Sequence, residues 1–285
     1  MKYLFLFFML LLTGRSISQP PAERALLWKI QAPGQKAPSY LYGTFHLLCP
    51  KDLVVDSAIK KAFVTTRQLY LEVDMSNSAA MAMEMIKFMK MSNNQHLSKL
   101  LSKADYDSVS HLFQAKTGMP LNLLGNTKPV LLIAMLYPSL MNCQPESWEQ
   151  TFVKMSEGMH MKMGGLETAE LQLSLLDSIP YKDQAESLKT ALYKFDSMAV
   201  ATKKMVELYK SKNLKQMQAE VAADKDMGAF ASILLDKRNA SWIPVMRAQM
   251  KKAPTFFAVG AGHLAGKNGV INLLRKSGYT VTAVK

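Results

Sequence analysis

The sequence predicts an α/β fold whose mixed central sheet is built from two strand–G-x-x-H–helix–strand units, with a large helical insert between them. Apolar runs stop at a glycine that is followed by a histidine in Gly43-Thr44-Phe45-His46 and again in Gly260-Ala261-Gly262-His263. A helical pattern and another apolar run follow each motif. Open α/β sheets bind ligands at the carboxyl ends of their strands, so we expect both imidazoles to lie in one site.

The first unit begins with a predicted hairpin of residues 25–31 and 39–43, because a turn containing Pro and Gly separates these two runs. A helix is expected from about Asp52 to Thr66. The strand predicted over 69–73 carries apolar side chains on both sides of its pleat, as a strand covered on both faces does.

Residues from about 76 to 250 are predicted to form the helical insert. Pro129 favours a short buried helix over 130–137 that Pro138 closes. A strand is predicted over 161–166, and further helices are expected over 147–156, 168–176 and 181–250, with breaks at Asn213 and Asp226. The chain has 21 methionines, which mostly recur at helical spacing and are interpreted as core filling.

The last unit repeats the outline of the first. Residues 255–259 are predicted to form a strand, His263 lies on the loop beyond it, and residues 269–276 form a helix before a strand over 279–284. Two such units suggest a sheet with parallel strands whose carboxyl ends converge on one site.

Residues 1–18 are predicted to be a signal peptide, because Lys2 precedes an apolar run over 3–12 and a small-residue end. We expect residues 19–285 to form a single exported domain, periplasmic or secreted, without a transmembrane anchor. The net charge of +13 is scattered through helical segments, which indicates a solvated surface and no nucleic-acid partner. The oligomeric state is not predicted.

Cys49 and Cys143 are the only cysteines of the chain. In an oxidising compartment they are expected to pair, which would tie the loop after the first G-x-x-H motif to the middle of the sequence. The alternative is that Cys49, three residues after His46, serves as a metal ligand or nucleophile.

Two imidazoles on such loops can hold a divalent metal ion if carboxylates complete the ligand set. Glu72, Asp74 and Glu167 stand at predicted strand ends and supply candidates. A bound ion would lower the pKa of its water while another carboxylate accepts the proton, so the pattern is consistent with metal-assisted hydrolysis. No H-E-x-x-H segment is present, which excludes a thermolysin-like zinc site. The other histidines are interpreted as surface or core side chains: His96, His111 and His160.

Five segments, taken together and in order, resemble the TraB/GumN family. They are Leu41-Tyr42-Gly43-Thr44-Phe45-His46, Leu71-Glu72-Val73-Asp74, Gly165-Leu166-Glu167-Thr168 with Gln172, Arg238-Asn239 with Trp242, and Val259-Gly260-Ala261-Gly262-His263-Leu264. That family is related to the Tiki proteins, metal-dependent proteases with paired G-x-x-H motifs, and to a wider group with erythromycin esterase-like and ChaN-like folds. The resemblance implies an α/β fold with both histidines at one site.

The resemblance also implies roles for individual residues. His46, His263 and Glu72 would be ligands of a divalent ion, Mn, Co or Zn, and Glu72 or Glu167 would act as ligand or general base. Arg238 would stabilise an oxyanion or hold a carboxylate, whereas the simpler alternative is an ion pair on a helix surface.

Supporting positions follow from the same resemblance. Gly43 and Gly260 would permit the tight backbone of each loop, and Asn239 lies on the helix of Arg238. Glu149 is the nearest equivalent of an acidic residue that many relatives carry upstream of the Gly-Leu-Glu segment.

We therefore expect an exported hydrolase, a Tiki-like metalloprotease that acts on a peptide or protein substrate. The alternative is a non-catalytic binding protein that uses the same cleft for haem, a metal or a peptide signal. A purely structural protein would leave both G-x-x-H histidines replaceable.

Overall fold

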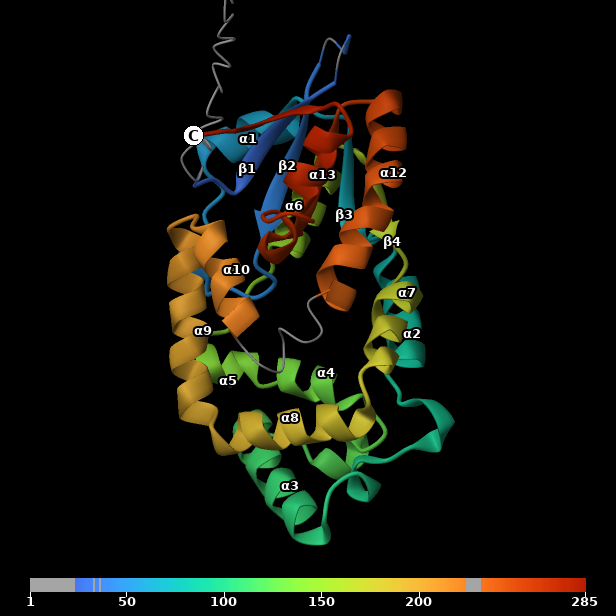
Figure 1. Ribbon diagram of the computed structural model, residues 1–285, viewed down its shortest axis with the longest axis vertical. Coiled ribbons are helices and arrows are strands. Elements are labelled where there is room, and N and C mark those ends of the chain that lie inside the picture. The colour runs from blue at the N-terminus through green and yellow to red at the C-terminus, as the bar shows by residue number, and fades with distance from the viewer. Residues whose placement is uncertain (1–23, 33, 36, 224–231) are drawn as a thin grey trace, which may run out of the picture.

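The computed structural model describes residues 24–285 apart from residues 33, 36 and 224–231. The predicted signal peptide, residues 1–18, and the predicted helix break at Asp226 lie outside the described residues. Within them, six strands form one mixed sheet in the order β4-β3-β5-β2-β1-β6 (Figure 1). The predicted α/β class is confirmed.

The central strands of the sheet are those that carry the two G-x-x-H motifs. β2 and β5 are parallel neighbours in which Gly43 pairs with Val259 and Thr44 with Gly260. β3 lies parallel to both β5 and β4, and β1 lies antiparallel between β2 and β6. The strands are β1 (Leu27–Gln31), β2 (Ser39–Thr44), β3 (Gln68–Val73), β4 (Lys162–Glu167), β5 (Thr255–Gly260) and β6 (Thr280–Ala283).

The two predicted units cross the sheet by different distances. β2 leads through α1 (Ser57–Val64) to β3, with β5 between them. β5 leads through α13 (Val270–Lys276) to β6, with both β2 and β1 between them. That these segments are two copies of one unit therefore stays a prediction.

Helices cover both faces of the sheet. Phe256 of β5 packs against Phe63 of α1 and Phe152 of α6 (Trp148–Glu157), with ring centroids 5.0 Å apart in both pairs. On the other face, α12 (Lys237–Lys252) contacts β4 and α13, and α13 contacts β6 (Figure 1). β5 is buried along its whole length because it is covered from both sides.

A second hydrophobic cluster lies away from the sheet, at the opposite end of the molecule (Figure 1). Its fully buried side chains include Phe113, Leu132 and Leu188, from three different helices. The single-domain organisation stays a prediction. In the described part of the long segment between β3 and α12, the α-helices are α2 (Ser78–Phe88), α3 (Lys103–Thr117), α4 (Pro129–Ala134), α5 (Tyr137–Met141), α6, α7 (Ala169–Ser174), α8 (Tyr181–Tyr193), α9 (Phe195–Lys210) and α10 (Leu214–Ala223).

The structure corrects several predicted boundaries. The strand predicted over 161–166 is confirmed as β4, which lies one residue later in the sequence and forms one edge of the sheet. Pro138 does not close a helix: α4 ends at Ala134 and Pro138 lies in the first turn of α5, where its missing N–H is not needed. α1 begins at Ser57 because Asp56 accepts a hydrogen bond from the backbone N–H of Ile59 at 2.8 Å and caps it.

Two further predictions about the insert have opposite outcomes. The break at Asn213 is confirmed, because α9 ends at Lys210 and α10 begins at Leu214. Core filling by methionine is wrong for α2, where no residue is buried and the side chains of Met83 and Met85 are 74% and 37% exposed.

Candidate functional site

Four neighbouring parallel strands end at one edge of the sheet and bring the predicted site residues together. β2 ends two residues before His46, and β5 ends three residues before His263. Glu72 is the penultimate residue of β3, and Glu167 is the last residue of β4. These residues therefore meet at the carboxyl edge, where open α/β sheets place their ligand sites.

Gly260 leaves the space in which three of these side chains converge. A Cβ at this position would lie 3.3 Å from Glu72 Oε1, 3.5 Å from His46 Nε2 and 3.6 Å from His263 Cδ2. The φ of Gly260 is −51°, so the position requires space and no unusual backbone. At Gly43 a Cβ would lie 2.6 Å from Leu264 Cδ1, because the loop after β5 packs directly on β2.

The guanidinium group of Arg238, in the first turn of α12, joins the carboxylates of β3 and β4. Its Nη2 donates to Glu72 Oε2 at 2.6 Å and to Glu167 Oε1 at 2.5 Å, and its Nε donates to Glu167 Oε1 at 2.9 Å. Its Nη1 donates to the carbonyl of Leu234 at 3.0 Å and lies 3.3 Å from His263 Nε2. All three side chains of this ion-pair network are less than a tenth exposed, so it is a buried clamp and not a surface ion pair.

Glu72 is held in its ionised form. Burial alone would raise the pKa of Glu72, but the positive charges around it, those of His263 and Arg238 first, lower the pKa to about 2. The backbone N–H of Gly260 also donates to Glu72 Oε1 at 2.7 Å. A carboxylate with so low a pKa is a weak base, which suits it to hold a cation better than to accept a proton.

His263 is buried and fixed in one orientation. Burial lowers the pKa of His263 to about 4, so its imidazole is neutral at neutral pH. Asn239 Nδ2 donates to the carbonyl of Asn268 at 2.9 Å, so Asn239 Oδ1 accepts from His263 Nδ1 at 2.7 Å. The remaining ring nitrogen, Nε2, lies 3.8 Å from Glu72 Oε1. The ring also packs on Trp242, with centroids 4.5 Å apart.

His46 lies at the exposed side of the site, with its side chain 64% exposed, and Glu149 of α6 holds it. Its Nδ1 is 3.0 Å from Glu149 Oε1, which also accepts from Thr44 Oγ1 at 2.6 Å. This hydrogen bond to Glu149 raises the pKa of His46 to about 9. Burial opposes the ionisation of Glu149, but the bond and charge of His46, together with the bonds from Thr44 and Ser147, outweigh burial and lower the pKa of Glu149. At neutral pH His46 is therefore an imidazolium, and a metal at Nε2 would have to displace a proton.

The donors fit a divalent ion chemically, although they are not gathered into a formed metal centre. Within the described residues, no group of three or more His, Cys, Asp or Glu side chains is placed to hold a metal ion. His46 and His263 each have Nδ1 bound to an oxygen acceptor, which leaves Nε2 as the ligating atom, as is typical of metal-binding histidines. At His263 this Nε2 accepts from Arg238 Nη1 at 3.3 Å, so a metal ion would have to displace that bond. Glu72 Oε1 completes a set of two imidazoles and one carboxylate that Zn, Mn and Co accept.

Comparison with known proteins places this chain in a family. Residues 26–283 match the TraB/PrgY/gumN family. The chain belongs to that family. Its similar proteins include Metalloprotease TIKI2 of Danio rerio, 21% identical over 94% of this chain, and Metalloprotease TIKI1 of Homo sapiens, 22% identical over 90%. The chain spans less than two thirds of these TIKI proteins, 63% and 61% of their lengths. No solved structure matches the chain.

Other residues predicted as candidates in this TraB/PrgY/gumN chain do not belong to the site. Cys49 and Cys143 form the expected disulfide, so Cys49 is neither a ligand nor a nucleophile. The exposed side chain of Asp74 accepts from the backbone N–H of Ser76 at 2.8 Å and lies outside the site. In the part of the chain described here, no helix is long or apolar enough to cross a membrane.

Three contacts of the site were not predicted. Trp242 Nε1 donates to Glu167 Oε2 at 2.9 Å, and Gln172 Nε2 donates to Glu72 Oε2 at 3.0 Å. The i,i+4 spacing of Trp242 and Arg238, which puts them on one helix face, was the available signal. Tyr209 of α9 donates from its hydroxyl to the carbonyl of Gly43 at 2.9 Å, and no motif of the TraB/GumN resemblance marks it.

Proposed function

We propose that the chain is an exported, metal-dependent hydrolase that cleaves peptide bonds in a peptide or protein substrate. The observation that carries this proposal is the convergence of His46 Nε2, Glu72 Oε1 and the His263 ring around Gly260. Membership of a family in which similar proteins are metalloproteases supports the same reaction class. The disulfide supports export to an oxidising compartment, either a periplasm or the exterior.

In the proposed site, His46 Nε2, His263 Nε2 and Glu72 Oε1 would hold a divalent ion such as Zn, Mn or Co. When bound, that ion would polarise a substrate carbonyl and lower the pKa of a water molecule. Glu149 and Asn239 accept the Nδ1 protons of the two imidazoles and so orient both Nε2 atoms toward the site.

Arg238 and Glu167 have positioning roles in this proposal. The side chain of Glu167 is 1% exposed and is held by Arg238 and Trp242, so it does not reach a substrate. All three nitrogens of the Arg238 guanidinium are engaged, which leaves it poorly suited to stabilise an oxyanion. Its charge keeps Glu72 ionised, and ionised Glu72 is what a cation requires.

One observation favours the alternative of a non-catalytic binding protein for haem, a metal or a peptide signal. Arg238 bonds to the carboxylates of both Glu72 and Glu167 and offsets one of their two negative charges, so part of the site's charge is compensated without a metal ion. With Arg238 in place of a metal ion beside Glu72, such a site would recognise a peptide without cleaving it.

The deciding experiment combines metal content with peptide cleavage. Purified mature protein is subjected to elemental analysis and incubated with a peptide library, with and without chelator, beside His46→Ala, His263→Ala and His111→Ala. His111 is the matched control, because it is exposed on α3, a helix that packs in the second hydrophobic cluster away from the sheet. We expect one divalent ion per chain and chelator-sensitive cleavage in the parent and control, both lost in the two site variants.

Two results would overturn the hydrolase proposal. Cleavage that survives chelation and both site substitutions would place the activity elsewhere. Peptide binding without cleavage in the metal-loaded parent would favour the binding-protein alternative.

A further inference from the structure

We propose that the Cys49–Cys143 disulfide is a redox-dependent positioning device for the site. In the oxidised chain the disulfide holds His46 against Glu149. Its reduction by a dithiol releases His46 and lowers the rate of peptide hydrolysis. The catalytic half of this inference rests on the proposed function, whereas its structural half is measurable without any substrate.

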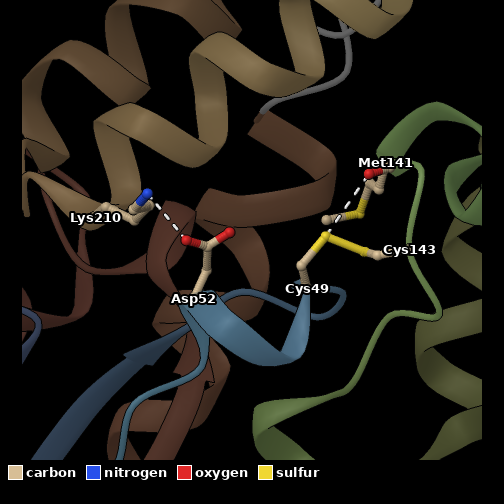
Figure 2. Close-up of a disulfide and its surroundings, with 5 residues drawn as sticks. All are labelled: Cys49, Asp52, Met141, Cys143 and Lys210. Atoms are coloured by element: carbon tan, nitrogen blue, oxygen red, sulfur yellow. Dashed lines mark hydrogen bonds and ion pairs between the residues drawn. A yellow bond between two sulfur atoms is a disulfide. The ribbon is translucent and has the colours of Figure 1, made fainter.

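The disulfide joins the two segments that carry His46 and Glu149. One segment follows β2 and the other leads into α6, whose first turn contains Glu149, and the bridge spans 94 residues of sequence between them (Figure 2). His46 stands three residues before Cys49, and Glu149 stands six residues after Cys143. The covalent link therefore lies beside the His46–Glu149 contact and on the same pair of segments.

The non-covalent contacts between these two segments are weaker than the bridge. Leu48 and Glu146 exchange two backbone hydrogen bonds, of 2.9 Å and 2.7 Å, His46 contacts Glu149 at 3.0 Å, and Thr44 at the end of β2 donates to Glu149 at 2.6 Å. Each such bond has a small net free energy because water competes for the same groups. The bond to His46 is the most open to competition, since that side chain is 64% exposed. Without the bridge, this corner of the site is held by bonds that open locally.

Opening is confined to that corner because both segments are anchored beyond it. Past Cys49, Asp52 pairs with Lys210 of α9 at 2.9 Å (Figure 2). Phe63 of α1 and Phe152 of α6 are fully buried against the sheet. Reduction is therefore expected to free His46 while the sheet and its covering helices remain folded.

The chemistry is a balanced thiol–disulfide exchange. Cys143 is the more accessible partner, being half-buried, whereas Cys49 is 8% exposed. A thiolate of the reducing dithiol attacks Cys143 Sγ, forms a mixed disulfide and expels the Cys49 thiolate, which takes up a proton. The second thiolate of the reductant then attacks the reductant sulfur in this mixed disulfide and releases the Cys143 thiolate, which takes up a proton. The chain has then gained two electrons and two protons, and the dithiol has become a cyclic disulfide.

The consequence is an enzyme whose activity follows the thiol state of its surroundings. While its cysteines are reduced, as in a cytosol, the chain would fold but would not hold His46 in place. Oxidation by a disulfide oxidant would complete the site, so peptide hydrolysis would begin only after export.

The structural test is amide hydrogen exchange on the full mature protein, oxidised and after treatment with dithiothreitol. We expect exchange at the hydrogen-bonded amides of Leu48 and Glu146 to accelerate by about tenfold or more on reduction, while amides of β5 stay protected. The variant Cys49→Ala/Cys143→Ala should show the accelerated pattern without reductant and should not respond to dithiothreitol.

The catalytic test uses the same samples on the peptide library. Reduction should lower kcat/KM by about tenfold or more, because misplacing a site residue by about 1 Å can cost that much, and reoxidation should restore it. Reduced protein whose two thiols are rejoined by a methylene bridge, using diiodomethane, should stay active in dithiothreitol. That control separates loss of the bridge from chelation of the metal by the reductant.

Each remaining outcome is decisive. Unchanged exchange at Leu48 and Glu146, or accelerated exchange with full activity, would overturn the positioning device. Loss of β5 protection on reduction would overturn it too, because the bridge would then support the whole fold. If the oxidised protein cleaves no peptide, the proposed function fails while exchange still decides whether the bridge holds the two segments together.

Discussion

Arg238→Met removes a cation from between two buried carboxylates and is expected to lower the free energy of unfolding by about 3–5 kcal/mol. The side chains of Glu72 and Glu167 are 8% and 1% exposed, so water does not replace the lost charge. Neutral donors remain at both carboxylates, the Gly260 N–H at one and Trp242 Nε1 at the other, which keeps the loss within this range. Methionine retains much of the apolar stem, so little of the loss comes from a cavity.

The assay is urea unfolding at neutral pH followed by far-UV circular dichroism. Arg247→Met is the matched control, because Arg247 is exposed on the same helix and its loss should cost about 0.5 kcal/mol or less. Adding Glu167→Gln to Arg238→Met should recover part of the stability, since it removes a buried charge that has lost its partner. Equal losses for Arg238→Met and Arg247→Met would refute the view of Arg238 as a buried clamp.

Three further predictions concern the same edge of the sheet. Gly260→Ala should reduce peptide cleavage by about tenfold or more and change the free energy of unfolding by about 1 kcal/mol, because its Cβ enters the space between Glu72 Oε1 and both imidazoles. The control is Gly262→Ala, whose Cβ would meet nothing within 4 Å and which should behave like the parent in both assays. Because the pKa of His263 is about 4 in the folded chain and about 6.5 in the unfolded chain, only the unfolded chain binds this proton between those pH values. The free energy of unfolding is therefore unaffected above pH 6.5 and falls by up to about 3 kcal/mol toward pH 4. His263→Gln should flatten that part of a urea-derived stability profile, and an unchanged slope would contradict the prediction. Loading a divalent ion should release a proton from His46, whose pKa is about 9, so calorimetric enthalpies at neutral pH should vary with the ionisation enthalpy of the buffer, and His46→Ala should abolish that dependence.

The strands were predictable from sequence because each buried strand is a short apolar run that ends at a glycine or a charged residue. Residues 39–43, 69–73 and 255–259 have that form and correspond to β2, β3 and β5. Their order in the sheet was not predictable, because the insertion of β5 between β2 and β3 depends on pairing between distant segments. No local pattern encodes such pairing.

The site was predictable to the same extent. Both G-x-x-H motifs stand at strand ends, so sequence placed His46 and His263 at the sheet edge correctly. Sequence could not decide between a buried clamp and a surface ion pair for Arg238, because both use the same residue types. The difference arises from the packing of α12 against the carboxyl edge, which also brings Trp242 to Glu167.

The place of β5 in the sheet has a consequence for biosynthesis. Until residues 255–260 have emerged from the ribosome, β1–β2 and β3–β4 are separate pairs with no strand to join them, and β1 gains its second neighbour only with residues 280–283. Such non-local pairing is slow and comes late. The nascent polypeptide therefore remains without its central sheet for most of translation, which keeps it in the unfolded form that the proposed export would require.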